Sequence, residues 1–278
     1  MKRIISIFLT LFIISIHASA QPKVTLKKTL ELKMPKTVDD ADCGTRGASV
    51  TWHPIQKKYY ASFAGNMSYP FGVFDVKGKR LSSDDLNAMI DLRGLWYNTS
   101  TKKISGNAYD NLGWFSYTLN DKGIVEKNTI DLEYDYDEYN LPEPQNVGAY
   151  DTAAKKVVFL YKSGVDYYNE DGYYAYSTDN KPIHFGKKTF TTSDVDSTTT
   201  PYAYNYTTVI YTGIKKADVG FLNVDNKQIE LYDSKTGLLT KILVLPKDAA
   251  VEASFNFAYA NGIYWLFNIE KRTWIGYK

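Results

Sequence analysis

The stretch Thr273-Trp-Ile-Gly-Tyr-Lys278, which ends the chain, is the fifth copy of a strand pattern that occurs four times before it. Each earlier copy is predicted to be the third strand of a repeating unit, and the four lie at residues 71–78, 113–123, 172–180 and 227–237. A further predicted strand follows each of those four, whereas no residue follows the fifth. The last unit therefore lacks a fourth strand, which another part of the chain must supply.

The segment Val24-Thr-Leu-Lys-Lys-Thr-Leu-Glu-Leu32 is a predicted strand with no partner near it in the sequence. A strand missing at one end of a repeat and left over at the other is typical of a closed ring of four-stranded blades. We therefore predict an all-β fold, a five-bladed β-propeller in which the N-terminal strand closes the last blade. Residues 21–278 would form this single domain, with about 51 residues for each blade, a length typical of propeller repeats.

The first two strands of each predicted blade share one hairpin pattern. The first strand ends in an aromatic residue, and the five first strands are Gly47–Trp52, Gly94–Tyr97, Asn146–Tyr150, Thr207–Tyr211 and Phe255–Tyr259. A polar turn follows, and in four blades it leads into a Lys-Lys pair that begins at Lys57, Lys102, Lys155 or Lys215. In the fifth blade Asn261-Gly262 takes this place, and Asn-Gly between apolar runs is a strong hairpin signal. We attribute most of these aromatic side chains to packing between strands.

Three segments interrupt the repeat. Ser82–Ile90 is predicted to form one or two helical turns with Ser83 as the N-cap. Two long polar connections, residues 133–140 and 191–200, are predicted to join a fourth strand to the next first strand. Loops of this kind carry function more often than the strands that they connect.

The first twenty residues have the pattern of an export signal. Lys2 and Arg3 form a charged start, Ile4–Ile16 is an apolar run too short to span a bilayer, and Ala18-Ser-Ala20 is a cleavage site. We therefore expect an exported protein, periplasmic or extracellular. No later apolar run reaches about 18 residues, so no membrane span is expected in the mature chain.

The charge, the cysteine content and the histidine positions argue against nucleic-acid binding, internal disulfides and a metal site. The formal net charge is +2, so nothing favours the binding of nucleic acid. Cys43 is the only cysteine, so no internal disulfide can form, and the fold must be held by its core and its ring closure. His53 and His184 do not pair with a second ligand at a suitable spacing, and we predict no metal and no cofactor.

Trp52-His-Pro-Ile-Gln-Lys-Lys-Tyr-Tyr60 and Tyr150-Asp-Thr-Ala-Ala-Lys-Lys-Val-Val158 resemble the hairpin of surface-layer-type (YVTN-like) bacterial propellers. Leu231-Tyr-Asp-Ser-Lys-Thr-Gly237 is similar to the outer turn of the same repeats. The export signal followed by Gln21 also resembles secreted proteins of Bacteroidetes-type bacteria. These resemblances imply a bacterial propeller and do not imply an activity, because propellers host binders, enzymes and scaffolds alike.

Residues that lead into the first strands are candidates for a binding site, because a propeller places equivalent loops in a ring around its channel mouth. The predicted ligand-binding residues of this group are Arg46, Arg93, Asn146, Asn205 and Glu252. Guanidinium groups beside amides suit an anionic or polyhydroxyl ligand. In the alternative interpretation the two arginines neutralise nearby carboxylates, and the sequence leaves both open.

Three tyrosines, Tyr109, Tyr167 and Tyr168, are predicted to lie in loops on the same face, beside Asp and Asn side chains. Aromatic faces stack on the C–H surface of a sugar ring, and neighbouring amides bond its hydroxyls. We therefore predict an exported, non-catalytic binding propeller whose ligand is carbohydrate-like or another cell-surface component. A protein-interaction scaffold without a small ligand is one alternative.

A glycoside hydrolase, or a related carbohydrate-active enzyme, is the other alternative. Asp42, Asp91 and Glu252 would then be the catalytic carboxylates, one acting as an acid and another as a base. Two carboxylates about 5–10 Å apart across an open cleft would favour hydrolysis. Arginines bonded to those carboxylates would favour ligand binding or a structural role.

Overall fold

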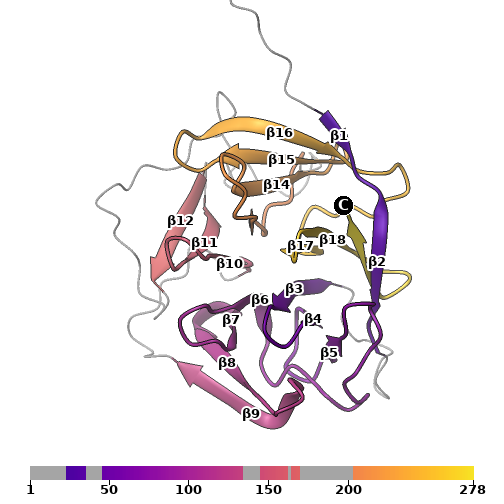
Figure 1. The fold of residues 1–278 in the computed structure, drawn as a ribbon, viewed down its shortest axis with the longest axis vertical. Helices are drawn as coiled ribbons and strands as arrows, with labels where there is room; N and C mark the ends of the chain where they lie inside the picture. Colours follow the sequence, from indigo (N-terminus) through magenta and orange to yellow (C-terminus); the bar gives the residue numbers. More distant parts are fainter. Residues whose placement is uncertain (1–22, 36–45, 134–144, 162–163, 170–202) are drawn as a thin grey trace, which may run out of the picture.

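The computed structural model describes residues 23–35, 46–133, 145–161, 164–169 and 203–278. These residues form five β-sheets around a common centre, and their only helical element is the 3-10 turn η1 (Asp110–Leu112) (Figure 1). The predicted five-bladed β-propeller is therefore confirmed. Within the described parts of the chain, no helix has the length and hydrophobicity that a membrane span requires.

Each blade is an antiparallel sheet whose first strand lies nearest the centre. Blade 1 contains β3 (Gly47–His53), β4 (Lys58–Phe63) and β5 (Phe71–Phe74). Blade 2 contains β6 (Leu92–Tyr97), β7 (Ile104–Ala108), β8 (Trp114–Leu119) and β9 (Val125–Glu133). Blade 3 contains β10 (Ala149–Asp151), β11 (Lys156–Tyr161) and β12 (Gly164–Asn169). Blade 4 contains β13 (Ile210–Tyr211), β14 (Val219–Asn223), β15 (Gln228–Asp233) and β16 (Leu238–Val244). Blade 5 contains β17 (Phe257–Ala260), β18 (Ile263–Asn268) and β19 (Thr273–Tyr277).

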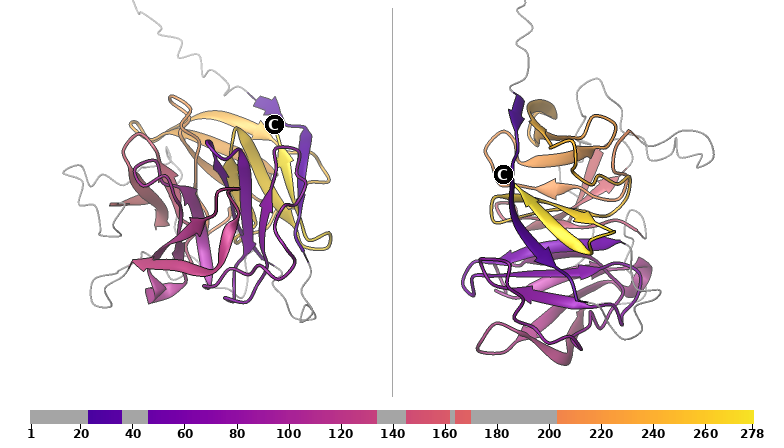
Figure 2. Two further views of the ribbon diagram at one scale, coloured as in Figure 1. Left: turned by 60° about the horizontal axis from the view of Figure 1, so that its bottom comes forward. Right: turned by 90° about the vertical axis from the view of Figure 1, so that its right-hand side faces the viewer.

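The N-terminal strand closes blade 5, as predicted. Strand β2 (Lys28–Lys33) pairs antiparallel with β19, in a register that places Trp274 opposite Leu32 and Tyr277 opposite Lys28. The first part of the predicted strand Val24–Leu32 does not join blade 5, however, because β1 (Lys23–Thr25) pairs parallel with β16 of blade 4. Residues 23–33, which we call the N-terminal strap, therefore hold the outer edges of two neighbouring blades together (Figure 2).

The side chains of the strap explain why it docks. Leu26 and Leu32 are buried, whereas Lys28, Glu31 and Lys33 are exposed, which is the alternation expected of a strand with one face on the core. Between β1 and β2 the backbone of Lys27 exchanges two hydrogen bonds with that of Lys278, at 2.8 and 2.9 Å. The strap thus also holds the end of the chain.

The repeated hairpin pattern has a local cause in the turn between the first and second strands. In three blades the side chain after the aromatic residue accepts backbone N–H groups of its own turn. His53 Nδ1 accepts from Gln56 at 3.3 Å, Asn98 Oδ1 from Ser100 at 2.8 Å, and Asp151 Oδ1 from Ala153 at 2.9 Å. Such side chains fold the backbone back on itself, which explains why His, Asn and Asp recur at this position.

Two sequence predictions about local structure are wrong. Ser82–Ile90 contains no helix. It runs beside β5 as an irregular edge with an isolated bridge at Pro70–Asn87, and Ser82 Oγ accepts the Val73 N–H at 3.1 Å. The third strand of blade 3 is β12, not residues 172–180, which lie outside the described residues.

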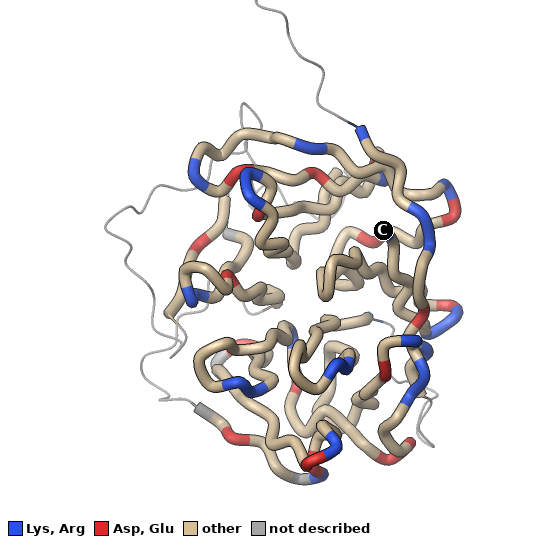
Figure 3. Tube along the Cα trace, viewed as in Figure 1, with Lys and Arg blue, Asp and Glu red and all other residues tan. Residues whose placement is uncertain are grey.

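Charged residues are rare near the axis. In the described first strands only Arg93 and Asp151 carry a formal charge, and the remaining charges lie mainly in turns and outer strands (Figure 3). Buried polar groups near the axis tie blades to each other instead. Asn107 Oδ1 accepts the N–H groups of Gly94 and Gly148, each at 3.0 Å, and its Nδ2 donates to the Asn146 carbonyl at 2.9 Å. A Cβ at Gly148 would lie 2.9 Å from Asn107 Oδ1, and one at Gly94 would lie closer still, so both positions require glycine.

Candidate functional site

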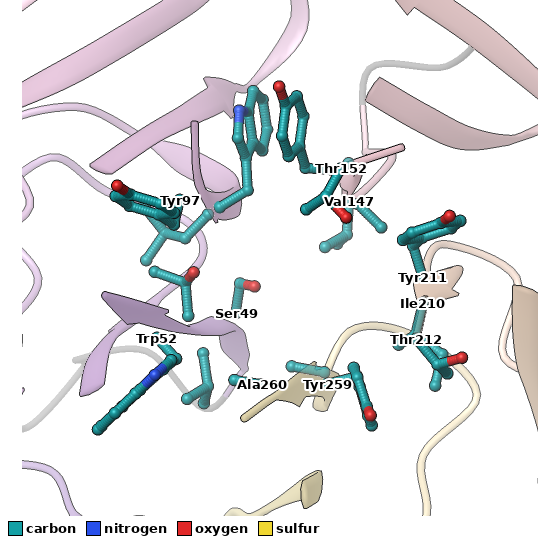
Figure 4. A pocket seen from close by; sticks show the side chains of 18 of the residues that line it. Ser49, Trp52, Tyr97, Val147, Thr152, Ile210, Tyr211, Thr212, Tyr259 and Ala260 are labelled. Atoms are coloured by element: carbon teal, nitrogen blue, oxygen red, sulfur yellow. The ribbon is translucent and has the colours of Figure 1, made fainter. Parts of the chain in front are cut away.

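A cavity of about 430 Å³ lies between the first strands of the five blades, and we call it the cup. Its walls come from those strands, among them the segments that carry Ser49, Val147 and Ile210 (Figure 4). Its mouth is formed by the turns that follow the strands, where Pro54, Thr99 and Asn261 are exposed. Ligand pockets in proteins commonly have volumes of about 300–1,000 Å³. The cup is therefore large enough for a small molecule or for a short segment of a polymer.

Each blade contributes an aromatic side chain at one equivalent position to the mouth of the cup, and Trp96 and Phe257 also line the cavity. The five equivalent side chains lie at the end of a first strand, or one residue before it, and they are Trp52, Tyr97, Tyr150, Tyr211 and Tyr259. Because the positions are equivalent in the repeat, the ring arrangement brings together residues that are far apart in the sequence (Figure 4). The sequence contained this signal, since each first strand ends in an aromatic residue, but the pattern alone favoured blade packing.

Contacts between neighbouring blades hold these rings in place. The His53 ring of blade 1 lies 4.6 Å from the Tyr97 ring of blade 2, between centroids. Thr99 Oγ1 of blade 2 lies 3.3 Å from the Tyr150 hydroxyl of blade 3. The Tyr211 hydroxyl of blade 4 is hydrogen-bonded to Asp151 of blade 3, and burial together with that carboxylate raises the pKa of Tyr211 well above its ordinary value. The mouth is thus preorganised before any ligand arrives.

The lining of the cup carries no carboxylate, ammonium, guanidinium or imidazole group among the described residues. Its polar side-chain groups are hydroxyls, one amide and two indole N–H groups. They come from Ser49, Thr51, Thr99, Thr152, Thr208, Thr212, Asn261, four tyrosines, Trp52 and Trp96. Such a surface can stack on a ligand and exchange hydrogen bonds with it. It offers no group that would act as a general acid or base near neutral pH.

The predicted site residues lie at the opposite end of the ring, around Phe255. The Arg46 and Arg93 guanidinium carbons lie 5.7 and 5.6 Å from the centre of the Phe255 ring. Asn205 Nδ2 donates to the carbonyl oxygens of Glu252 and Phe255, at 3.0 and 2.8 Å. The structure therefore brings Arg46, Arg93, Asn205 and Glu252 together, but none of them lines the cup.

Phe255 is buried at this end of the ring. It is 2% exposed, and residues that lead into blades 1, 2 and 4 contact its ring or backbone. Phe255 and Asn256 both have left-handed φ angles, 51° and 58°, which side chains rarely adopt without support. The Phe255 N–H donates to Thr207 Oγ1 at 2.7 Å, and Asn256 Oδ1 accepts the Gly47 N–H at 2.6 Å. These bonds hold Phe255 among residues that lead into blades 1, 2 and 4.

The guanidinium group of Arg93 already has hydrogen-bond and charge partners within the protein. Its side chain is 4% exposed, forms an ion pair with Asp91, and donates from Nε to Gln145 Oε1 at 3.1 Å. The Tyr109 ring lies 4.7 Å below the guanidinium carbon. Of the two interpretations that the sequence left open, the geometry of Arg93 supports neutralisation of a carboxylate.

The remaining predicted residues are dispersed. Asn146 is buried and its Nδ2 donates to the Leu160 carbonyl. Tyr167 and Tyr168 do not lie in a loop, because both belong to β12. Tyr168 packs 5.2 Å from Phe159 within blade 3, and Tyr167 is hydrogen-bonded to Ser234 of blade 4. Asp42 lies outside the described residues. Within those residues there is no group of three or more His, Cys, Asp or Glu side chains that could hold a metal ion.

Acid should lower the stability of the folded protein through His53, the last residue of β3, beside the mouth of the cup. Burial, helped by the charge of Lys58, lowers the His53 pKa from its ordinary value of 6.5, so the unfolded chain binds the proton more readily than the folded one. The stability that neutral His53 contributes is therefore complete above pH 6.5 and falls as the pH drops below that value. Replacing His53→Asn, the residue that blade 2 uses at this position, should reduce the loss of melting temperature between pH 7.5 and 5.5. Equal losses in both proteins would contradict this role.

No known protein-family model matches this chain, and no curated protein matches its sequence. Among solved structures, a glutaminyl cyclase from Myxococcus xanthus is similar over 93% of this chain and 98% of its own, with a TM-score of 0.52 and 8% identity. A virginiamycin B lyase from Staphylococcus aureus is similar over 87% of this chain and 81% of its own, with a TM-score of 0.45 and 11% identity. At these identities the likeness concerns the fold alone.

Proposed function

We propose that this chain is an exported binding protein without catalytic activity, and that its ligand is a carbohydrate or a similar component of a cell surface. The observation that carries the proposal is the cup, an uncharged cavity at whose mouth five blades each present an aromatic ring. Strands on a closed ring hold these side chains rigidly, so little ordering is needed when a ligand binds.

The chemistry of the cup suits a sugar ring. The C–H faces of a sugar are apolar and stack on Trp and Tyr, while its hydroxyl groups exchange hydrogen bonds with protein hydroxyls and amides. Both kinds of group are present, with Trp52 and Tyr97 on one side of the cup, Tyr211 and Thr212 on the other, and Tyr259 between them (Figure 4).

The hydrolase alternative has weaker support. Asp91, one of its three predicted carboxylates, is bonded to Arg93, and it also accepts the Gly65 N–H at 2.8 Å. A carboxylate held in this way is poorly suited to exchange protons with a substrate. The cup, where a substrate would fit, has no carboxylate among its described lining residues. A scaffold role makes no use of the cup and is separated from the proposal by the experiment below.

Truncating a ring at the mouth should weaken binding. In a calorimetric titration with the glycans that bind the wild-type protein, Tyr97→Ala and Trp52→Ala should each lower the affinity about tenfold, because a truncated aromatic contact costs roughly 1–2 kcal/mol. Tyr97→Phe should retain most of the affinity, since it keeps the stacking face.

Tyr69→Ala provides the matched control. Tyr69 is also a partly buried tyrosine that packs on a phenylalanine, but it lies in a loop of blade 1 away from the cup. Its truncation should leave affinity unchanged. If no glycan binds, or if Tyr69→Ala weakens binding as much as Tyr97→Ala, the cup is not the binding site.

A further inference from the structure

Four turns around the mouth of the cup carry a lysine at the same place. Each of these lysines lies three residues after a residue that lines the mouth, namely Pro54, Thr99, Thr152 or Gly213. We call the four the lysine collar, and they are Lys57, Lys102, Lys155 and Lys216. In the fifth blade Asn261, itself part of the lining, has the corresponding left-handed backbone.

Backbone geometry does not explain why these residues are lysines. Their φ angles are positive, at 52°, 61°, 55° and 64°. Glycine adopts this region without steric cost and asparagine adopts it readily, whereas other side chains are disfavoured there. Four disfavoured lysines at equivalent positions therefore point to a use for their side chains.

The collar side chains have no partner among the described residues. All four residues are exposed, and none of their ammonium groups takes part in a hydrogen bond or ion pair with that part of the chain. The other two basic residues with left-handed backbones differ in this respect. Lys227 Nζ donates to the Lys247 carbonyl at 2.7 Å, and Arg272 lies 4.7 Å from the centre of the Phe63 ring.

Little negative charge offsets the collar at the mouth. Two carboxylates lie in or beside the same four turns, and both are already bonded. Asp151 is 7% exposed and accepts hydrogen bonds from Tyr211 and from the backbone of its own turn. Asp218 is partly buried and accepts hydrogen bonds from the backbone and the hydroxyl group of Ser234. Basic segments lie on the turns of four of the five blades around the central opening (Figure 3). An uncharged aromatic cavity is thus ringed by ammonium groups that are free to bind anions.

We propose that the ligand is an acidic polysaccharide, with one of its sugar rings in the cup and the carboxylate or sulfate groups of adjacent residues on the collar. This inference rests on the proposed carbohydrate-binding function and specifies the class of carbohydrate. A cavity of about 430 Å³ accepts only a short part of a chain, so the flanking residues must lie over the turns that carry the collar. Ammonium groups there attract anions from any direction, which suits a flexible polymer.

The test compares acidic probes with an uncharged probe. Oligogalacturonate and its fully methyl-esterified form share one backbone, and a heparin oligosaccharide serves as the sulfated probe. Calorimetry at 50 and 300 mM salt should show at least tenfold tighter binding of one of the acidic probes than of the esterified probe at low salt. That preference should shrink at high salt, because exposed charges are screened.

Replacing the collar by glycine removes the charge without loss of fold, because glycine is favoured at these φ angles. The variant Lys57→Gly/Lys102→Gly/Lys155→Gly/Lys216→Gly should melt at or above the wild-type temperature and lose the preference for acidic probes. A control variant changes four exposed lysines away from the cup to glutamine, namely Lys23, Lys33, Lys247 and Lys271. It has the same net charge as the collar variant and should bind like the wild type.

The possible failures can be distinguished. If acidic and esterified probes bind equally and Trp52→Ala abolishes both, the collar inference is wrong and carbohydrate binding stands. If no probe of either kind binds, the proposed function fails together with the inference. If oligo-deoxythymidylate competes with the acidic probes and Trp52→Ala has no effect, the collar is a general anion surface and the polysaccharide assignment is overturned.

Discussion

A chain that starts at residue 34 should fail to fold cooperatively. Without the N-terminal strap, β19 loses its only outer neighbour, and β16 loses the parallel strand that covers its edge. Two adjacent blades would then expose unpaired backbone groups, which is also a hazard for aggregation. We expect the truncated chain to lack a sigmoidal urea transition by circular dichroism. A truncated chain that unfolds with the wild-type midpoint would contradict closure by the strap.

Point variants in the strap give a graded form of the same test. Leu32 is fully buried opposite Trp274, so Leu32→Ala should lower the free energy of unfolding by about 2–5 kcal/mol, the usual cost of truncating a core leucine. Lys33→Ala changes an exposed side chain of the same strand and should alter it by at most about 0.5 kcal/mol. Similar effects of the two changes would mean that the strap acts through strand pairing alone.

Closure of blade 5 could be predicted because it leaves a pattern in the sequence. The alternation of Leu30 and Leu32 with charged residues marks a half-buried strand, and the repeat lacks one strand where the chain ends. The pairing of β1 with β16 has no such pattern. It involves three residues on each strand, all of the β1 side chains are exposed, and the partners lie more than 200 positions apart.

In blade 3 the sequence pattern did not identify the third strand. Residues 164–169 and 172–176 are both short aromatic runs beside glycine, and either could be the third strand. Strand pairing decided in favour of the first, because β11 and β12 pair along six residues from Lys156 to Tyr161. Register of this kind depends on contacts across the sheet and not on the composition of one segment.

The predicted site residues around Phe255 and the aromatic residues of the cup lie near opposite ends of the first strands. Ring symmetry correctly indicated that residues near the first strands converge. At the end away from the cup, the ring of Phe255 lies near Arg46 and Arg93, and its backbone has a left-handed φ of 51°. No propensity rule assigns that conformation to phenylalanine, since it persists only where the surroundings enforce it. The aromatic residues at the opposite end, where the first strands finish, line the mouth of the cavity.

Arg93→Ala should destabilise the protein instead of weakening ligand binding. From sequence alone the expected effect was a loss of binding of roughly 1–3 kcal/mol, with folding intact. The structure reverses this expectation, because Arg93 is buried, bonded to Asp91 and Gln145, and remote from the lining of the cup. Removing one partner of a buried ion pair usually costs about 3–5 kcal/mol. We expect a value of about 3 kcal/mol, at the lower end of that range, because the Asp91 side chain is 21% exposed and water can reach it.

A double variant separates the charge from the packing. Arg93→Met keeps the length of the side chain and leaves Asp91 unpaired, so it should cost nearly as much as Arg93→Ala. Adding Asp91→Asn removes the unpaired carboxylate and should recover a large part of the loss, since replacing both partners of a buried pair is often close to neutral. Urea unfolding measures these differences, and calorimetry on the folded double variant measures its affinity, which should match the wild type. A stable Arg93→Ala protein that binds ligand more weakly than the wild type would indicate that the binding site lies at the Phe255 end of the ring.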